Sequence, residues 1–183
     1  MNERMNPILI LQAHPRADDS VVQKAMRQSL AGMEGIHRRD LYALYPNFDI
    51  DVQAEQRALQ QAHILVIQCP MYWYSTPAIV KEWIDLVLEY GWAYGPGGHA
   101  LAGKFFTFAL STAGSQEGYS PGGHHLAEVG EFLLPFRQTA VTCGMRWLEP
   151  FVIYQGRKLT PVQLDVAVKA YRQHLENLRD HTD

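Results

Sequence analysis

The chain has 183 residues and a hydrophobic content of 47%, enough for one ordinary domain with a sizeable core, so we expect a single domain over residues 1–183. A formal net charge of −3 offers no basic stripe to neutralise phosphates, which argues against a nucleic-acid partner. We expect a cytoplasmic protein for two reasons. The two cysteines are far apart and form no CxxC pair, and no apolar run has the length of a secretory leader or a membrane span.

The first predicted strand covers residues 8–13, and the polar loop after it ends at Ser20. Ser20 is a good helix N-cap, and apolar residues then recur on one helical face until Gly32. The free N–H groups and positive dipole end of this helix would form a phosphate site beside the loop. Spacing alone favours an ordinary capped helix, because Asp18 and Asp19 place negative charge where an anion would bind.

Residues 36–42 form a weaker predicted strand, whose polar interruptions suit the edge of a sheet. A turn at Tyr45, Pro46 and Asn47 follows. Asp51 can cap a helix over residues 52–62, and because polar residues dominate that helix we expect it to lie on the surface.

The central stretch, residues 63–91, combines a strand, an aromatic loop and a helix. Residues 64–69 suit a strand buried on both faces. Pro70 and Pro77 bracket the loop, and the helix after Pro77 carries one apolar stripe that includes Trp83. The loop contains Met71, Tyr72, Trp73 and Tyr74. At a strand's carboxyl end such a loop suits a planar cofactor, although single aromatics there more often belong to a core or a dimer interface.

Residues 91–103 are rich in glycine but contain neither GKS nor GxGxxG, so we interpret them as a connection. The fourth predicted strand, residues 104–112, ends in the turn STAGS. Small residues let the backbone of such a turn approach a ligand, and its N–H groups can donate to a heterocycle; a plain turn fits the same residues.

Residues 118–125 form a polar excursion that is too long for a tight turn, and functional residues often lie in such segments. Tyr119 and His125 are its titratable residues of interest, although both could simply be exposed. His124, His125 and Glu128 have no third histidine or cysteine at zinc-like spacing, so we expect no metal site.

Residues 126–142 are predicted to form one helix that Pro135 kinks, and residues 147–154 to form the fifth strand. Thr160 and Pro161 begin a last amphipathic helix. Strand and helix therefore alternate five times, which is typical of a doubly wound α/β fold with a parallel sheet.

The string MYWYSTPAIVKEWID resembles a segment of the flavodoxin-like NAD(P)H quinone oxidoreductases, in which a proline, an aromatic pair and a helix hold the flavin ring. The matching residues are Pro70, Trp73, Tyr74, Pro77, Ala78, Lys81 and Trp83. The family's phosphate loop, a strand followed by AHP and later S-x-x-N, is matched by His14, Pro15 and Ser20, with Gln23 in place of asparagine. STAGS is close to the family's TTGG. The resemblance implies a flavodoxin-like, five-stranded parallel sheet in the order 2-1-3-4-5, with helices on both faces.

The resemblance also implies a bound flavin, and we expect FMN rather than FAD because the chain lacks the long C-terminal extension of some FAD-binding members. Its phosphate would lie at the helix opening near Ser20, and its ring between the loop from Met71 to Tyr74 and the turn from Thr112 to Ser115. The implied cofactor-binding residues are His14, Ser20, Val21, Val22, Gln23, Pro70, Met71, Tyr72, Trp73, Tyr74, Thr112, Ala113, Gly114 and Ser115. Tyr119 and His125 match a tyrosine and a histidine that stabilise charge in the family, so we expect them to be catalytic.

The implied reaction is hydride transfer from NAD(P)H to the flavin and two-electron reduction of a quinone, with the redox chemistry supplied by the flavin. The strings DLYALYPNFDID and GWAYGPGG resemble a narrower branch that includes ancillary proteins of glutathione-regulated potassium-efflux systems. The alternative function is therefore a regulatory subunit, docked on a potassium-efflux protein at the inner face of the cell membrane. A one-electron carrier like flavodoxin is disfavoured by the modest charge and the lack of a TGNT-like loop.

The resemblance further implies a homodimer, because members of the family complete each site with residues of the partner chain. We expect Trp83 and its apolar neighbours on the helix after Pro77 to contribute to a flat apolar patch around the ring.

Overall fold

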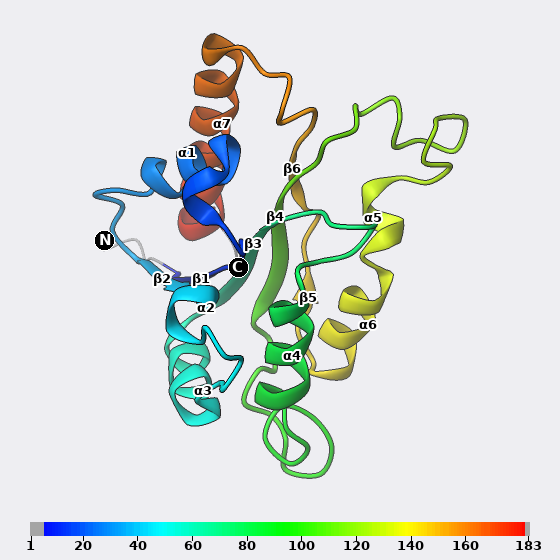
Figure 1. Cartoon of the computed structure of the whole chain (residues 1–183). Coiled ribbons are helices and arrows are strands. Elements are labelled where there is room, and N and C mark those ends of the chain that lie inside the picture. The colour runs from blue at the N-terminus through cyan, green and yellow to red at the C-terminus, as the bar shows by residue number, and fades with distance from the viewer. Residues whose placement is uncertain (1–5, 182–183) are drawn as a thin grey trace.

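The structure is a computed structural model that describes residues 6–181. Its centre is a parallel sheet with the strand order β2-β1-β3-β4-β5, in which β6 also pairs with β4 (Figure 1). The strands are β1 (Ile8–Gln12), β2 (Ile36–Asp40), β3 (Ile64–Pro70), β4 (Phe105–Ser111), β5 (Arg146–Trp147) and β6 (Phe151–Ile153). The helices are α1 (Val21–Ser29), α2 (Leu41–Leu44), α3 (Val52–Gln61), α4 (Ala78–Val87), α5 (Val129–Phe132), α6 (Leu134–Thr142) and α7 (Pro161–His181), with a short 3-10 helix at Ala17–Asp19. The predicted doubly wound, flavodoxin-like order is confirmed.

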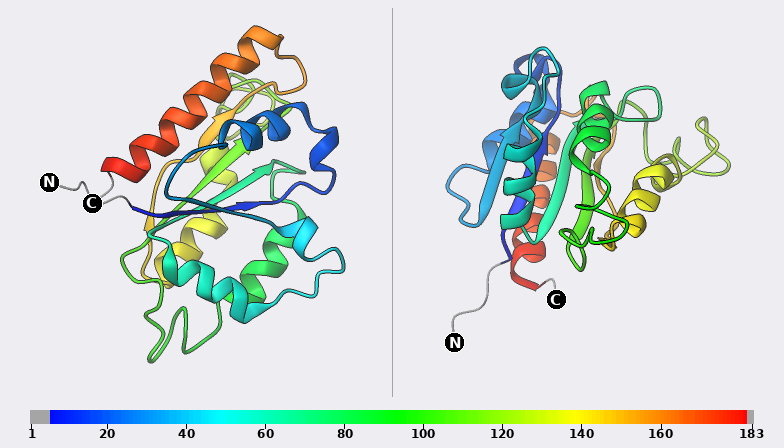
Figure 2. Two further views of the ribbon diagram at one scale, coloured as in Figure 1. Left: turned by 90° about the vertical axis from the view of Figure 1, so that its left-hand side faces the viewer. Right: turned by 90° about the horizontal axis from the view of Figure 1, so that it is seen from below.

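Helices cover both faces of the sheet (Figure 2). Because successive side chains of a strand point to opposite faces, Ile8 and Ile10 of β1 join the core beneath α1 and α7. Leu9 and Leu11 join the core on the other face, beneath α3, α4 and α6. No helix within residues 6–181 has both the length and the apolar composition to cross a bilayer.

The predicted caps of two helices are present. The Ser20 hydroxyl accepts a hydrogen bond from the Gln23 N–H at 3.2 Å, and the Asp51 carboxylate accepts one from the Ala54 N–H at 2.9 Å. Residues 52–62 were expected to lie on the surface because polar residues dominate them, but Glu55 is completely buried. A side chain this polar is buried because three neighbouring side chains donate hydrogen bonds to its carboxylate. The donors are Arg39, Tyr45 and Trp83.

Two predicted elements are interrupted, and a proline explains each interruption. The predicted fifth strand is divided into β5 and β6, with Pro150 between them, because proline has no N–H to donate to the neighbouring strand. The predicted helix over residues 126–142 is two helices, α5 and α6, that meet at Leu133. Pro135 lies in the first turn of α6, where proline is tolerated, so it starts a helix instead of kinking one.

Trp83 lies in the core and not on the surface. Its exposed fraction is 0%, and its Nε1–H donates to Glu55 at 2.9 Å. The prediction that Trp83 contributes to an apolar surface patch is therefore wrong, whereas the dimer itself stays a prediction.

Candidate functional site

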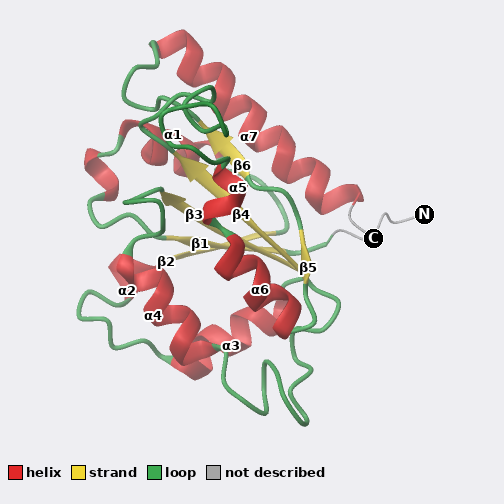
Figure 3. Cartoon of the chain, turned by 90° about the vertical axis from the view of Figure 1, so that its right-hand side faces the viewer, coloured by secondary structure: helices red, strands yellow, loops and turns green. Residues whose placement is uncertain are grey.

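A cavity of about 440 Å³ opens at the carboxyl ends of β1, β3 and β4. Figure 3 shows β3, β4 and β6 pointing toward this end of the molecule, and the glycine-rich segment after α4 lies at the other end (Figure 1). The strand order reverses between β1 and β3, the position at which open α/β sheets bind ligands. The lining residues are His14, Arg16, Asp19, Ser20, Val21, Val22, Pro70, Met71, Tyr72, Ser111, Thr112, Ala113, Gly156, Arg157 and Leu159.

The first turn of α1 forms one wall of the cavity. Ser20 caps the helix through the N–H of Gln23, and its carbonyl accepts the N–H of Lys24. The N–H groups of Val21 and Val22 therefore remain at the open helix end, where they can donate to an anion. The side chain of Gln23 turns into the interior, and only 4% of the residue is exposed. Gln23 is thus absent from the cavity wall, unlike Ser20, Val21 and Val22.

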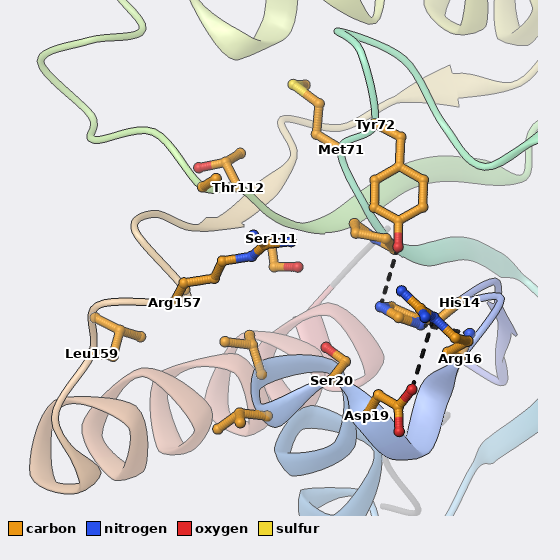
Figure 4. A pocket seen from close by; sticks show the side chains of 15 residues that line it. His14, Arg16, Asp19, Ser20, Met71, Tyr72, Ser111, Thr112, Arg157 and Leu159 are labelled. Carbon is orange, nitrogen blue, oxygen red and sulfur yellow. Dashed lines mark hydrogen bonds and ion pairs between the residues drawn. The ribbon is translucent and has the colours of Figure 1, made fainter.

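His14 is held in one neutral form by its neighbours. Its Nδ1 accepts the backbone N–H of Arg16 at 3.0 Å, which places the ring proton on Nε2, 3.5 Å from the hydroxyl of Tyr72 (Figure 4). Burial, and then the charge of Arg16, lower the pKa of His14 below its usual value of 6.5. This lowered pKa favours the neutral ring, which offers an N–H donor at Nε2.

The aromatic loop is a tight two-residue turn. Tyr72 and Ser75 exchange backbone hydrogen bonds of 2.9 and 3.0 Å, while Trp73 and Tyr74 at the tip have φ of 47° and 63°. This left-handed geometry is uncommon outside glycine. Pro70, Met71 and Tyr72 line the cavity, but Trp73 is 94% exposed. Neither Trp73 nor Tyr74 is among the residues that line the cavity.

The turn after β4 closes the other side. Thr112 and Ala113 line the cavity, and two hydrogen bonds to the loop after β6 hold the turn. The Gln155 N–H donates to the Gly114 carbonyl at 3.0 Å, and the Gly156 N–H donates to the Thr112 carbonyl at 2.9 Å. Neither Gly114 nor Ser115 lines the cavity.

Tyr119 and His125 are brought together behind this turn. Their rings are stacked with centroids 4.0 Å apart, and His125 Nδ1 lies 3.4 Å from the hydroxyl of Tyr74. A Cβ atom at position 114 would lie 2.5 Å from His125 Nε2, so only glycine leaves room for the His125 ring in this position. Burial, and then Tyr74 and Tyr154, raise the pKa of Tyr119, so its hydroxyl keeps its proton at neutral pH. The pair adjoins the cavity without lining it.

Sequence reasoning missed several lining residues, among them Ser111 and Arg157. Figure 4 shows the Arg157 side chain extending across the cavity toward Ser111. The same rule that pointed to the loops after strands one, three and four would have found Arg157, because its loop follows β6. Within residues 6–181, no group of three metal-binding side chains is present.

A family model for proteins with the flavodoxin-like fold matches residues 6–175. The chain belongs to this family. It is 41% identical over 170 residues to KefG of Yersinia enterocolitica, a glutathione-regulated potassium-efflux system ancillary protein, and the match covers 93% of this chain and 92% of that one. The resemblance to the potassium-efflux branch of the quinone reductase family is thereby confirmed.

Solved structures of the family show the same fold with differently described activities. General stress protein 14 of Treponema denticola, in complex with FMN, has a TM-score of 0.90 and 34% identity, covering 94% of this chain and 99% of that one. An NADPH-quinone reductase from P. pentosaceus has a TM-score of 0.84 and 27% identity, covering 92% and 96%. A protein from Streptomycin violaceusniger described as a thermophilic tryptophan halogenase has a TM-score of 0.90 and 41% identity, covering 91% and 97%. Function must therefore be argued from the site.

Proposed function

We propose that this chain binds FMN in the cavity and reduces a quinone with NAD(P)H by two electrons. The observation that carries the proposal is the cavity of about 440 Å³ at the switch point, with a helix N-terminus on one wall and a small-residue turn on another. The FMN complex of a protein 34% identical, and a quinone reductase 27% identical, support it. FAD is the alternative cofactor.

The residues of the cavity fit a phosphorylated planar ligand. The N–H groups of Val21 and Val22 would hold the phosphate, and the neutral His14 would donate from Nε2. Thr112 and Ala113 would face the ring with little bulk. A bound flavin would supply the chemistry, by accepting hydride from NAD(P)H and passing two electrons to the quinone.

We further propose that Tyr119 and His125 are the catalytic residues of this chain. Tyr119 keeps its proton, and His125 is held between the Tyr119 ring and the Tyr74 hydroxyl, so both are preorganised donors. Donors that need not reorient stabilise charge that develops during hydride transfer better than mobile ones do. His125 could also pass a proton to the quinone, because a ring N–H placed beside the site can act as a general acid.

Purification and reconstitution test the cofactor. We expect a yellow protein whose released flavin has the mass of FMN, and which reduces simple quinones when NADH or NADPH is supplied. A preparation that neither contains flavin nor takes up FMN or FAD at micromolar concentration would refute the proposal. Incubating the same preparation with tryptophan, chloride, NAD(P)H and dioxygen as the oxidant tests for halogenation, and we expect no chlorinated product.

A second function is favoured by the 41% identity to KefG over 93% of this chain. We propose that the protein also serves as an ancillary subunit of a glutathione-regulated potassium-efflux transporter, in the cytoplasm at the inner face of the membrane. Co-expression with such a transporter should raise glutathione-controlled potassium efflux and yield a complex that co-purifies. Efflux that is the same with and without the protein would count against this role.

We also propose that the chain forms a homodimer. The tip of the aromatic turn supports this, because Trp73 is 94% exposed beside the half-exposed rings of Tyr72 and Tyr74. Light scattering should give a mass of two chains at working concentration, and a monomer at every concentration tested would contradict the prediction.

A further inference from the structure

A buried chain of hydrogen bonds runs from α7 to the wall of the cavity. Tyr171 on α7, Gln68 on β3 and Gln23 on α1 are 0%, 2% and 4% exposed. The Tyr171 hydroxyl lies 3.1 Å from Gln68 Oε1, and Gln68 Nε2 lies 3.1 Å from Gln23 Oε1. Gln23 Nε2 in turn lies 2.9 Å from Oγ of Ser111, the last residue of β4 and part of the cavity wall.

One contact to the backbone fixes the direction of donation along this chain. Gln68 Nε2 also lies 3.5 Å from the backbone carbonyl oxygen of Gln23, which can only accept, so this end of the Gln68 carboxamide must be its NH₂ group. Gln68 Oε1 then accepts from Tyr171 and, at 3.3 Å, from Gln12. Gln23 accepts through its oxygen, so its nitrogen is left to donate to Ser111.

The consequence falls on the Ser111 hydroxyl. Its oxygen accepts from Gln23, and its own proton has no acceptor among residues 6–181. The neighbouring Thr112 differs, because its hydroxyl donates to the Gly114 carbonyl at 2.9 Å. Ser111 therefore has an O–H donor free for a ligand, and aligned hydrogen bonds in a low-dielectric interior strengthen one another.

We propose that Gln23, Gln68 and Tyr171 are positioning residues that orient the Ser111 hydroxyl to donate to a hydroxyl or phosphate oxygen of the ligand. The proposal rests on the proposed binding of FMN. Ser111, Thr112 and Ser20 all line the cavity, with Ser111 drawn between the other two (Figure 4), so its donor would face the sugar-alcohol chain that joins the ring of a bound FMN to its phosphate. The position of Gln23, predicted as a direct cofactor contact, thus has an indirect role.

A double-mutant cycle on FMN affinity tests this relay, by which we mean the hydrogen bonds that run from Tyr171 through Gln68 and Gln23 to Ser111. Ser111→Ala should weaken FMN binding about threefold to tenfold, as expected for one neutral hydrogen bond. Gln23→Met, which keeps the length but removes the donor, should weaken binding by a similar factor in the wild-type background. In the Ser111→Ala background the same change should have less than about a twofold effect, because the group through which it acts is gone.

Lumiflavin, which lacks both the sugar-alcohol chain and the phosphate, separates positioning from general damage to the pocket. Its affinity should change less than about twofold in every variant. Ser29→Ala is the matched control, because the Ser29 hydroxyl bonds only within α1, to the carbonyl of Met26. If Gln23→Met fails to fold, Tyr171→Phe, which removes one oxygen at the far end of the chain, replaces it in the cycle.

Four results would overturn the relay. Equal losses from Gln23→Met with and without Ser111, or equal losses for FMN and lumiflavin, would show that the network only satisfies buried polar atoms. Unchanged FMN affinity in Ser111→Ala would show that the Ser111 hydroxyl makes no hydrogen bond to FMN. A wild-type protein that binds neither probe would instead refute the proposed function, and the relay with it.

Discussion

Replacing Arg39 with Leu should destabilise the fold by leaving a buried carboxylate without its cation. Arg39 approaches Glu55 at 2.6 Å, and Glu55 is 0% exposed; Tyr45 and Trp83 would remain as its neutral donors. Breaking a buried ion pair typically costs about 3–5 kcal/mol. The Arg39 side chain is itself 25% exposed, so water can partly replace it, and we expect the lower end, about 3 kcal/mol. For a domain of this size that corresponds to a fall in Tm of roughly 6–12 °C.

Urea denaturation followed by far-UV circular dichroism measures this change. Glu55→Gln in the Arg39→Leu background removes the unpaired charge, so the double variant should be less destabilised than the sum of the two single variants. Arg38→Leu is the control, because the guanidinium of the exposed Arg38 hydrogen-bonds to the Arg27 carbonyl at 3.3 Å and to no buried carboxylate within residues 6–181. A loss below about 1 kcal/mol in Arg39→Leu, or strict additivity in the double variant, would refute the importance of this buried pair.

In stopped flow, His125→Ala should slow the reduction of bound flavin by NAD(P)H about tenfold to a thousandfold, because the loss of a donor to developing charge raises the barrier by about 1.5–4 kcal/mol. Unchanged rates in this variant and in Tyr119→Phe would show that the two side chains have no catalytic role. Gly114→Ala should reproduce most of that defect, since its Cβ would lie 2.5 Å from His125 Nε2; full activity would show that the pair can shift freely. Burial lowers the pKa of His174 in the folded protein below its usual value of 6.5. As the pH falls through 6.5, His174 is therefore protonated in the unfolded chain before it is protonated in the folded protein, and the free energy of unfolding decreases. His174→Phe should reduce this slope between about pH 7 and 5 in urea titrations, and an unchanged slope would assign it elsewhere.

The sequence was informative wherever a local rule determines the structure. Ser20 and Asp51 begin helices because their side chains can satisfy free N–H groups in the first turn, which requires no knowledge of distant residues. The five alternations of strand and helix likewise predicted a parallel sheet without knowledge of which residues contact one another. The strand order came from the resemblance, because no local pattern states which strands become neighbours.

The sequence failed where a side chain's direction depends on distant neighbours. Gln23 follows the N-cap like the exposed Val21, but it turns inward because Gln68 and Ser111, 45 and 88 residues away, offer hydrogen-bond partners. Glu55 is buried within a polar helix for a similar reason. Such polar contacts between distant elements leave no periodic signal in the chain.

The aromatic turn shows the same limit and gives the candidate site its internal connection. Tyr72, Trp73 and Tyr74 are adjacent in sequence and suggested one flat platform, but two consecutive left-handed residues point the three rings in different directions. Tyr72 faces His14 in the cavity, Trp73 faces solvent, and Tyr74 packs against the His125 ring at 5.7 Å between centroids. Left-handed residues outside glycine cost roughly 1–3 kcal/mol each and persist only where neighbours hold them. The neighbours here are the wall of the cavity on one side and the Tyr119–His125 pair on the other, so this short turn fixes the position of the proposed catalytic pair relative to the proposed cofactor pocket.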